Sequence, residues 1–307
     1  MQTTSRILMI RPLNFSFNIQ TSATNAFQLR DDEPDVQKRA REEFDHFTAV
    51  LQNEGIDVTI IDDTPDPETP DSIFPNNWIS LHDDGTVCLY PMHAPNRRLE
   101  RKPHILSWLS EHYDITSRID LSGFEDHQLY LEGTGSMVLD RTNRIAYACL
   151  SPRTDMRVLE RFCTMMKYRP VVFHATDPNE TAIYHTNVMM SVADDFVILA
   201  TDTVHDERER NHLLQVIHQS GKEVISISVE QMNEFAGNML QLHNNKQEKL
   251  LVMSTRAFES LAPEQIEKIS RSCRIVHAPL TIIEKIGGGS ARCMIAEIHL
   301  PEKKKAR

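Results

Sequence analysis

Three residue types that can act together in covalent catalysis occur at similar places along this sequence. Glu132, His185 and Cys293 each stand where a loop leads toward a predicted β-hairpin. A cysteine thiolate can attack an electrophilic carbon, a histidine can carry the proton, and a carboxylate can orient the imidazole. Taken singly, each has a simpler interpretation, as a small core residue, a buried structural histidine or part of a turn. Their shared position is what favours a catalytic site.

The elements that would position these residues follow one repeated order of helix, strand and hairpin. The first copy predicts a helix over 35–53, a strand over 57–62 and a hairpin with strands 78–81 and 86–90. In the later copies, helices are predicted over 103–112, 154–167 and 206–220 and from residue 263. The strands that follow them are predicted over 114–119, 170–174, 223–229 and 274–278. Hairpins are predicted over 136–149, 186–200 and 238–254. A final strand is predicted over 293–299, and residues 6–10 can supply its hairpin partner.

A repeat of this kind favours a closed architecture over two tandem domains. We expect an α/β fold in the form of a five-fold pseudosymmetric β/α propeller, a ring closed by the N-terminal strand. Residues 1–307 would form a single domain with a short basic tail over 302–307. Closure removes exposed sheet edges, and an open α/β sheet is the alternative. In a ring, equivalent positions converge on the axis, so Glu132, His185 and Cys293 would meet there.

Composition excludes several classes of protein. The chain has 33 Lys and Arg against 44 Asp and Glu, a formal net charge of −11, and 40% hydrophobic residues. This is globular composition, and an acidic balance disfavours a nucleic-acid partner. No apolar stretch approaches the ~20 residues that cross a bilayer, and the N-terminal apolar run is too short for a signal peptide. We therefore expect no membrane partner.

The cysteines and histidines indicate neither a disulfide framework nor a metal site. The 5 cysteines are odd in number and widely spaced, which suggests a reducing, cytoplasmic location. No His-Glu-x-x-His spacing or dinucleotide-binding glycine motif occurs, so we expect no metal and no cofactor. The expected partner is a small molecule, and a homo-oligomer is left open.

With these residues in view, the chain resembles the guanidino-group-modifying enzymes of the pentein superfamily, which are five-fold β/α propellers. That superfamily includes arginine deiminases, dimethylarginine dimethylaminohydrolases, amidinotransferases and succinylarginine dihydrolases. The resemblance rests on residues 71–74, Glu132-Gly133, residues 150–154, His185 and the glycine-rich approach to Cys293. Within the superfamily, Arg11-Pro12 and residues 24–28 and 74–78 are similar to the citrulline-utilisation hydrolases, or citrulline ureidases.

The resemblance implies a role for each of these residues. Cys293 would be the nucleophile, His185 the general acid and base, and Glu132 the partner of that histidine. Arg153 would hold the α-carboxylate of an amino-acid substrate; the alternative is a surface arginine at a helix start. Asp71 would reach the polar end of the substrate or cap its loop, and Asn76 is included among the substrate-binding residues.

Asn77 and Asn187 separate this sequence from the arginine deiminases, which place aspartates at the matching sites. A guanidinium cation between two neutral amides would lose two charge-assisted contacts, each of roughly 1.5–3 kcal/mol. A neutral ureido oxygen instead accepts hydrogen bonds, and an asparagine amide can donate them. Such donors would also stabilise the oxyanion that forms when the cysteine adds to the carbon.

The sequence therefore predicts a cysteine hydrolase that cleaves the ureido group of citrulline to ornithine, carbon dioxide and ammonia. An S-carbamoyl-cysteine would be the intermediate. One alternative is a guanidine hydrolase of the arginine deiminase or dihydrolase type, since succinylarginine dihydrolases keep one of the two asparagines. The other is a non-catalytic pentein binding protein, which would not need the cysteine, histidine and glutamate together.

Overall fold

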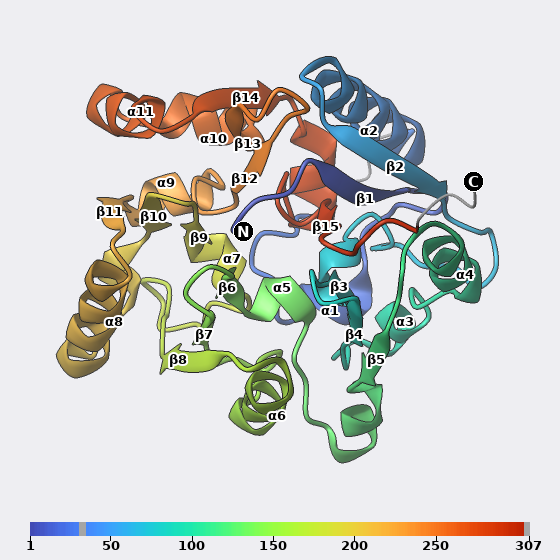
Figure 1. Cartoon of the computed structure of the whole chain (residues 1–307), viewed down its shortest axis with the longest axis horizontal. Helices are drawn as coiled ribbons and strands as arrows, with labels where there is room; N and C mark the ends of the chain where they lie inside the picture. Colours follow the sequence, from blue (N-terminus) through green and yellow to red (C-terminus); the bar gives the residue numbers. More distant parts are fainter. Residues whose placement is uncertain (31–34, 304–307) are drawn as a thin grey trace.

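The computed structural model describes residues 1–30 and 35–303, and its strands form five small sheets arranged around a common centre (Figure 1). In every sheet the middle strand pairs antiparallel with one neighbour and parallel with the other. The five sheets are β15 (Ala296–Glu297), β1 (Arg6–Arg11) and β2 (Asp57–Asp62); β3 (Ile79–Leu81), β4 (Thr86–Leu89) and β5 (Ser117–Asp120); β6 (Val138–Asp140), β7 (Ile145–Cys149) and β8 (Arg169–Phe173); β9 (Met190–Val192), β10 (Phe196–Leu199) and β11 (Glu223–Ser226); and β12 (Leu240–His243), β13 (Lys249–Ser254) and β14 (Arg274–Ala278).

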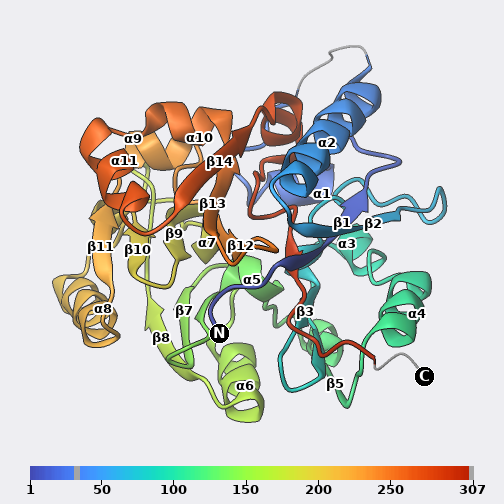
Figure 2. The ribbon, with the colours of Figure 1, turned by 45° about the horizontal axis from the view of Figure 1, so that its top comes forward.

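Each parallel connection passes through a helix that lies at the outside of the molecule in two views (Figures 1 and 2). These outer helices are α2 (Val36–Asn53), α4 (Pro103–His112), α6 (Met156–Met166), α8 (Glu207–Gln219) and α11 (Pro263–Ser270). The remaining α-helices are short: α1 (Ile19–Ser22), α3 (Pro95–Arg98), α5 (Gly133–Ser136), α7 (Thr186–Met189), α9 (Val229–Asn233) and α10 (Thr255–Ser260). The chain also forms 3-10 turns η1 (Pro75–Asn77), η2 (Ser122–His127) and η3 (Thr201–Thr203), and a π-helical turn, η4 (Ile283–Gly287).

Helix α6 shows why the outer helices form and how they pack. Asp155 caps its first turn by accepting a hydrogen bond from the backbone N–H of Arg157. Apolar residues then recur at helical spacing, so that one face is apolar. On that face, Leu159, Phe162 and Met166 are buried in one hydrophobic cluster together with Ala146 and Ala148 of β7. The helix is therefore fixed to its own sheet.

Most predicted elements are present, and three predictions are wrong in ways that matter for the site. The first strand of the hairpin predicted over 186–200 begins instead as helix α7, and β11 ends at Ser226 because Ser228 caps α9 through a capping box with Gln231. The strand predicted over 293–299 is reduced to β15, since turn bonds from the N–H of Cys293 to Ser290 and of Ile295 to Arg292 hold the preceding residues. Of the predicted tail over 302–307, residues 304–307 lie outside the described residues.

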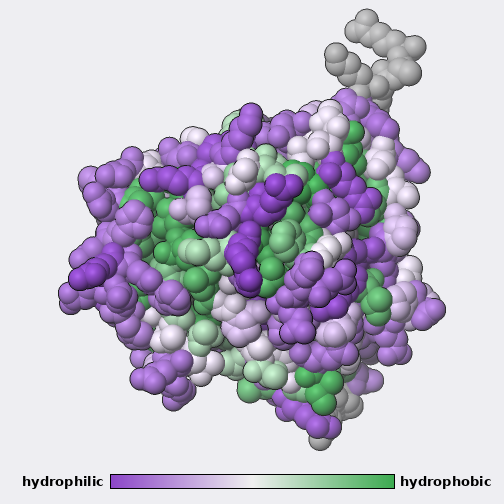
Figure 3. Space-filling model, turned by 90° about the horizontal axis from the view of Figure 1, so that it is seen from below, coloured by the Kyte–Doolittle hydropathy of each residue, from purple (hydrophilic) through white to green (hydrophobic). Residues whose placement is uncertain are grey.

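Hydrophobic residues gather in the hollows of one face, between hydrophilic side chains that cover most of it (Figure 3). Within residues 1–30 and 35–303, no helix has both the length and the apolar character needed to cross a membrane. All 5 cysteines are buried and free of disulfides. One of them is therefore available for chemistry only where a cavity reaches it.

Candidate active site

Short helical turns open the hairpins of three neighbouring sheets and meet near the centre of the molecule (Figure 1). Gly133 allows α5 to lie directly on η1, because its φ is +48° and a Cβ there would come within 2.4 Å of the η1 backbone. Gly135 leaves room for two side chains: a Cβ would lie 2.4 Å from Asn77 Nδ2 and 2.7 Å from His185 Nδ1. The turns thus bring Asn77, Glu132 and His185 together.

Glu132 and His185 form a buried pair. His185 Nε2 lies 2.8 Å from Glu132 Oε2, and the two side chains are 2% and 0% exposed. Burial alone would raise the pKa of Glu132, but the charge of Arg153, the hydrogen bond from His185 and the charge of Arg97 hold it well below its usual range. Burial lowers the pKa of His185 to about 4 against the opposing contact with Glu132. The pair therefore consists of an ionised carboxylate and a neutral imidazole at neutral pH.

The protonation of Glu132 decides which nitrogen of His185 can act as a base. An ionised carboxylate only accepts hydrogen bonds, so Nε2 carries the imidazole proton and donates it. Nδ1 is then the nitrogen with the free lone pair, and it is the nitrogen that faces Gly135 and Asn77. This arrangement can remove a proton from a neighbouring group and later return it.

Cys293 lies in the turn between η4 and β15 and shares a small cavity with His185, Asn77 and Arg153. Its side chain is buried, and its Sγ accepts two amide hydrogen bonds, from Asn238 Nδ2 at 3.2 Å and from Asn187 Nδ2 at 3.5 Å. Gly289 packs against Cys293, where a Cβ would lie 3.3 Å from that of the cysteine.

Asn238, the first residue of the hairpin predicted over 238–254, contacts the sulfur of Cys293 but was not among the predicted site residues. Its Oδ1 accepts the backbone N–H of Arg292 at 3.1 Å, and its Nδ2 donates to the carbonyl of Asn187 at 2.9 Å. These two contacts fix the orientation of the amide, so the second N–H of Nδ2 must point at the sulfur of Cys293. The position of Asn238 at the start of the fourth hairpin is the feature of the sequence that could have identified it as a site residue.

Arg97 of α3 is a second residue that the sequence analysis missed. Its guanidinium is buried, binds Glu100 through two hydrogen bonds of 2.8 and 3.0 Å, and donates from Nη1 to Asn77 Oδ1 at 2.9 Å. Since arginine can only donate, the oxygen of Asn77 must face Arg97, which leaves its NH₂ group beside Gly135 without a partner among the described residues. Arg97 lies on a connection outside the repeated hairpin mouths, so the repeat gave no signal for it.

Asp71 is also part of this cluster, whereas Asn76 is set apart from the cavity. Asp71 Oδ2 accepts from Asn18 Nδ2 at 2.8 Å and lies 3.7 Å from Arg97 Nε, and burial raises the pKa of this carboxyl. Its Oδ1 has no partner among the described residues. The side chain of Asn76 is fully buried and also lacks partners there, but it does not line the cavity. Asn76 is thus the one predicted site residue that has no contact with the others through its side chain.

Arg153 is buried beneath a segment near the N-terminus, residues 18–29, which we call the strap. Its Nη2 donates to the carbonyl of Thr21 at 2.8 Å and to Thr24 Oγ1 at 2.6 Å, and its guanidinium lies 4.8 Å from the centre of the Tyr184 ring. The strap oxygens thus accept hydrogen bonds from the guanidinium N–H groups of Arg153 that could otherwise bind a carboxylate. Arg153 therefore lines the cavity, with polar groups of the strap as its partners.

The strap also closes the cavity. Asn25 Nδ2 donates to the carbonyl of Gly288 at 3.3 Å, and the N–H of Leu29 donates to the carbonyl of Lys285 at 2.8 Å. The enclosed space is about 10 Å³, close to the room that one water needs. An amino acid does not fit into this space as it stands, so binding one there would require the strap or another wall of the cavity to move.

Within the described part of the chain, no group of three or more His, Cys, Asp or Glu side chains is arranged to hold a metal ion. The reactive groups that line or adjoin the cavity are a thiol, an imidazole, carboxylates and amide donors.

Comparison with solved structures identifies the class of fold. The chain is 18% identical, with a TM-score of 0.75, to ArgZ, an arginine dihydrolase from the ornithine-ammonia cycle in Cyanobacteria. The alignment covers 96% of this chain, but only 41% of full-length ArgZ and 98% of its N-terminal domain. A dimethylarginine dimethylaminohydrolase adduct with S-methyl-L-thiocitrulline matches 97% of this chain and 100% of that one, at 16% identity and a TM-score of 0.65.

These matches show that the chain has the fold of the pentein enzymes. Residues 11–300 match the model of the family described as N,N dimethylarginine dimethylhydrolase, eukaryotic, and the chain belongs to that family. Among curated proteins, none is similar enough in sequence to count as a relative.

Proposed function

We propose that this protein hydrolyses the ureido group of citrulline to ornithine, carbon dioxide and ammonia. The observation that carries the proposal is the hydrogen bond from Arg97 to Asn77, a residue that lines the cavity, because this bond occupies the amide oxygen and leaves the NH₂ group to donate. This NH₂ group has no partner among the described residues. A buried donor without a partner suits the oxygen of a ureido group or of its tetrahedral adduct.

The carboxylates near the cavity support the same substrate. Asp71 is the acidic residue that lines it, and Arg97 lies beside its Oδ2. Oε2 of Glu132 lies 2.8 Å from His185 Nε2, 3.8 Å from Arg97 Nη1 and 3.5 Å from Arg153 Nη1. Glu132 and Oδ2 of Asp71 thus already face cations of the protein, for which a guanidinium would compete, whereas Oδ1 of Asp71 has no partner among the described residues. A neutral ureido group needs no such counter-charge.

The geometry supports a reaction in two covalent steps. His185 Nδ1 takes the proton of the Cys293 thiol, and the sulfur adds to the ureido carbon while Asn77 and Asn187 donate to the oxygen. The adduct collapses when His185 returns the proton to the δ-nitrogen, which leaves as the amine of ornithine. The enzyme then carries an S-carbamoyl group. Water, deprotonated by His185, releases carbamic acid, which separates into carbon dioxide and ammonia.

Arg153 is proposed to hold the α-carboxylate of the substrate. When the strap moves, the carboxylate would replace Thr21 and Thr24 on the guanidinium and would restore two charge-assisted hydrogen bonds. We also propose that residues 1–307 form a single domain, a five-fold propeller closed by the N-terminal strand. The antiparallel pairing of β1 with β15 supports this closure.

Arginine is the second candidate substrate, because the similar structures include an arginine dihydrolase and a dimethylarginine dimethylaminohydrolase. Purified protein should be offered citrulline, arginine and N,N-dimethylarginine separately, with ornithine, citrulline and ammonia measured. We expect ornithine and ammonia from citrulline, and no turnover by a Cys293→Ser variant. Turnover of arginine or dimethylarginine without turnover of citrulline would overturn the assignment, and binding without any turnover would indicate a non-catalytic protein.

A further inference from the structure

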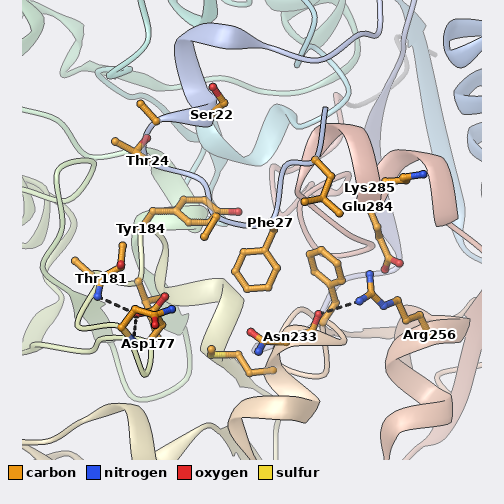
Figure 4. Close-up of a pocket in the computed structure, with 18 of the residues that line it drawn as sticks. Ser22, Thr24, Phe27, Asp177, Thr181, Tyr184, Asn233, Arg256, Glu284 and Lys285 are labelled. Atoms are coloured by element: carbon orange, nitrogen blue, oxygen red, sulfur yellow. Dashed lines mark hydrogen bonds between the residues drawn. The ribbon is translucent and has the colours of Figure 1, made fainter. Parts of the chain in front are cut away.

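A second and much larger cavity lies on the other side of the strap from the catalytic residues. Its volume is about 700 Å³, within the range of cavities that hold small organic ligands. The strap, the loop before α7, helix α9 and the turn η4 supply its walls (Figure 4). Its apolar lining includes Phe27, Ile183, Tyr184, Met232 and Phe235.

The strap separates this cavity from the catalytic one. Thr21 and Asn25 face the catalytic cavity, whereas Ala23, Thr24 and Phe27 face the larger one. Tyr184 lines both cavities and donates from its hydroxyl to the carbonyl of Gly288 at 2.8 Å. The two cavities are therefore distinct spaces that share one wall.

Glu284 lines the larger cavity and is the polar group in it that lacks a partner. Its side chain is buried, its Oε1 accepts a 2.5 Å hydrogen bond from Ser290 Oγ, and its Oε2 has no hydrogen-bond partner among the described residues. Burial raises the pKa of this carboxyl to about 7. A ligand that donates a hydrogen bond, and above all one that carries a positive charge, would compensate for this loss of solvation.

The charge of Arg256 and hydrogen bonds from Ser254 and Ser290 favour the carboxylate of Glu284, but Arg256 forms no ion pair with it. Arg256 faces it in Figure 4, but the guanidinium of Arg256 forms an ion pair with Glu234 instead. The carboxylate of Glu43, which is also nearby, accepts the backbone N–H groups of Ile282 and Ile283. The side chain of Lys285 extends away from Phe27 in the same view. The unpartnered oxygen is thus left to whatever fills the cavity.

Aromatic rings supply a matching apolar surface. Phe27 packs against Tyr184 and Phe235, with ring centres 6.3 and 5.1 Å apart. The faces of such rings attract organic cations as well as apolar groups. A carboxylate beside aromatic faces is a combination that favours an ammonium group attached to an apolar body.

We infer that this cavity is a second binding site, which takes a small amphipathic amine with its ammonium group on Glu284 and its apolar body against Phe27 and Phe235. The site is coupled to catalysis at two points. Ser290, which binds Glu284, also accepts the backbone N–H of Cys293 at 2.9 Å, and the strap that lines this cavity also closes the catalytic one. A bound amine would hold the strap in place and slow turnover; this last statement rests on the proposed function.

The test uses three probes that share a phenyl group: 2-phenylethylamine, the neutral 2-phenylethanol and the anionic 3-phenylpropionate. Calorimetry on the full chain without substrate should show binding of the amine, at least about tenfold tighter than the alcohol, and no binding of the anion. Glu284→Gln should weaken amine binding about tenfold and leave the alcohol unchanged. Phe27→Ala should weaken both, and Glu259→Gln, an exposed acid on α10, should change neither.

Three results would overturn the inference. One is the absence of amine binding at about 10 mM. Another is equal amine affinity in the Glu284→Gln variant, with folding checked by circular dichroism. The third is unchanged amine affinity in the Phe27→Ala variant, because Phe27 lines the larger cavity and not the catalytic one. Because the binding measurements need no turnover, they remain informative even if citrulline is not the substrate.

Discussion

The chemistry of the site depends on amide side chains whose orientation is set by groups that can only donate or only accept. Arg97 orients Asn77, and the backbone N–H of Arg292 orients Asn238. Each amide then presents N–H groups to a reacting atom: Asn77 to the expected substrate oxygen, and Asn238 to the sulfur of Cys293. Replacing an amide by a carboxylate of the same shape would invert that polarity, which makes the argument testable.

The first prediction concerns the choice between a ureido and a guanidinium substrate. The double variant Asn77→Asp, Asn187→Asp should lose at least about 100-fold in kcat/KM for citrulline, because two donors to the oxygen become acceptors. Its kcat/KM for arginine relative to citrulline should rise. Folding should be retained, since Arg97 can donate to a carboxylate as it does to the amide. Unchanged citrulline turnover would contradict the proposed role of the two amides.

The second prediction concerns activation of the thiol. Asn238→Asp should slow alkylation of Cys293 by iodoacetamide at each pH tested, because an acceptor replaces the donor to the sulfur. Asn238→Ala should act in the same direction but more weakly. Asn244→Asp is the matched control, a buried amide in the β12–β13 turn that accepts the N–H groups of Lys246 and Glu248. Equal alkylation profiles for all the proteins would refute a contact between Asn238 and the reacting sulfur.

At the scale of elements, the strap and the glycine-rich turn after η4 act as a unit. Gly288 has a φ of +62°, and a Cβ there would lie 2.6 Å from both Asn25 Nδ2 and Gln28 Cγ of the strap. Only a residue without a side chain lets the strap lie this close to the catalytic turn. The strap is also the element that the sequence analysis did not describe, since its contacts are polar and irregular rather than periodic.

The third prediction compares two glycines with similar backbone angles. Gly288→Ala and Gly221→Ala should each cost about 1 kcal/mol of unfolding free energy from backbone strain, because Gly221 has a φ of +79°. A Cβ at Gly221 meets no atom within 4 Å, so its activity should be unchanged. Gly288→Ala should lose about tenfold or more in kcat/KM, because the strap is displaced. Urea denaturation and citrulline kinetics on both variants would show the difference, and equal activity would argue against the strap contact.

At the scale of the whole molecule, a second buried cluster of charges lies among residues of β15 and its neighbours. Glu297 of β15 binds Arg292 and His299 at 3.0 and 3.2 Å and lies 3.4 Å from Arg141. Burial and the charge of Arg141 lower the pKa of His299 to about 4. The cluster thus holds a neutral histidine that must gain a proton when the chain unfolds in mild acid.

The fourth prediction follows from the sign of that shift. The pKa of His299 is lower in the folded than in the unfolded chain, so the unfolded state binds more protons between about pH 6.5 and 4, and stability falls as the pH falls through that range. Between about pH 6.5 and 4, the unfolding free energy should fall in both proteins. The fall should be about 1–3 kcal/mol smaller in a His299→Gln variant than in the unsubstituted protein. Denaturant titrations at several pH values would measure it. A parallel pH dependence in both proteins would show that His299 does not carry this effect.

The periodic part of the fold was predictable from the sequence, and the irregular part was not. Apolar stripes and β-branched runs indicated the outer helices and most strands, and the repeat indicated which loops converge. Helical turns such as α7 and the turn at Cys293 depend on contacts with other sheets, which a local pattern does not record. Arg97 and Asn238 were missed for the same reason, because their roles arise from hydrogen bonds across more than 15 residues of sequence.

The central claim is that Cys293 becomes carbamoylated by citrulline. Its most direct test is mass spectrometry of the peptide that contains Cys293, after acid quenching of the protein during turnover. We expect the mass of one carbamoyl group on that cysteine with citrulline, its absence in the Cys293→Ser protein, and its loss as substrate is exhausted. Formation of ornithine with Cys293 always unmodified, or an adduct that forms only from arginine, would contradict the account.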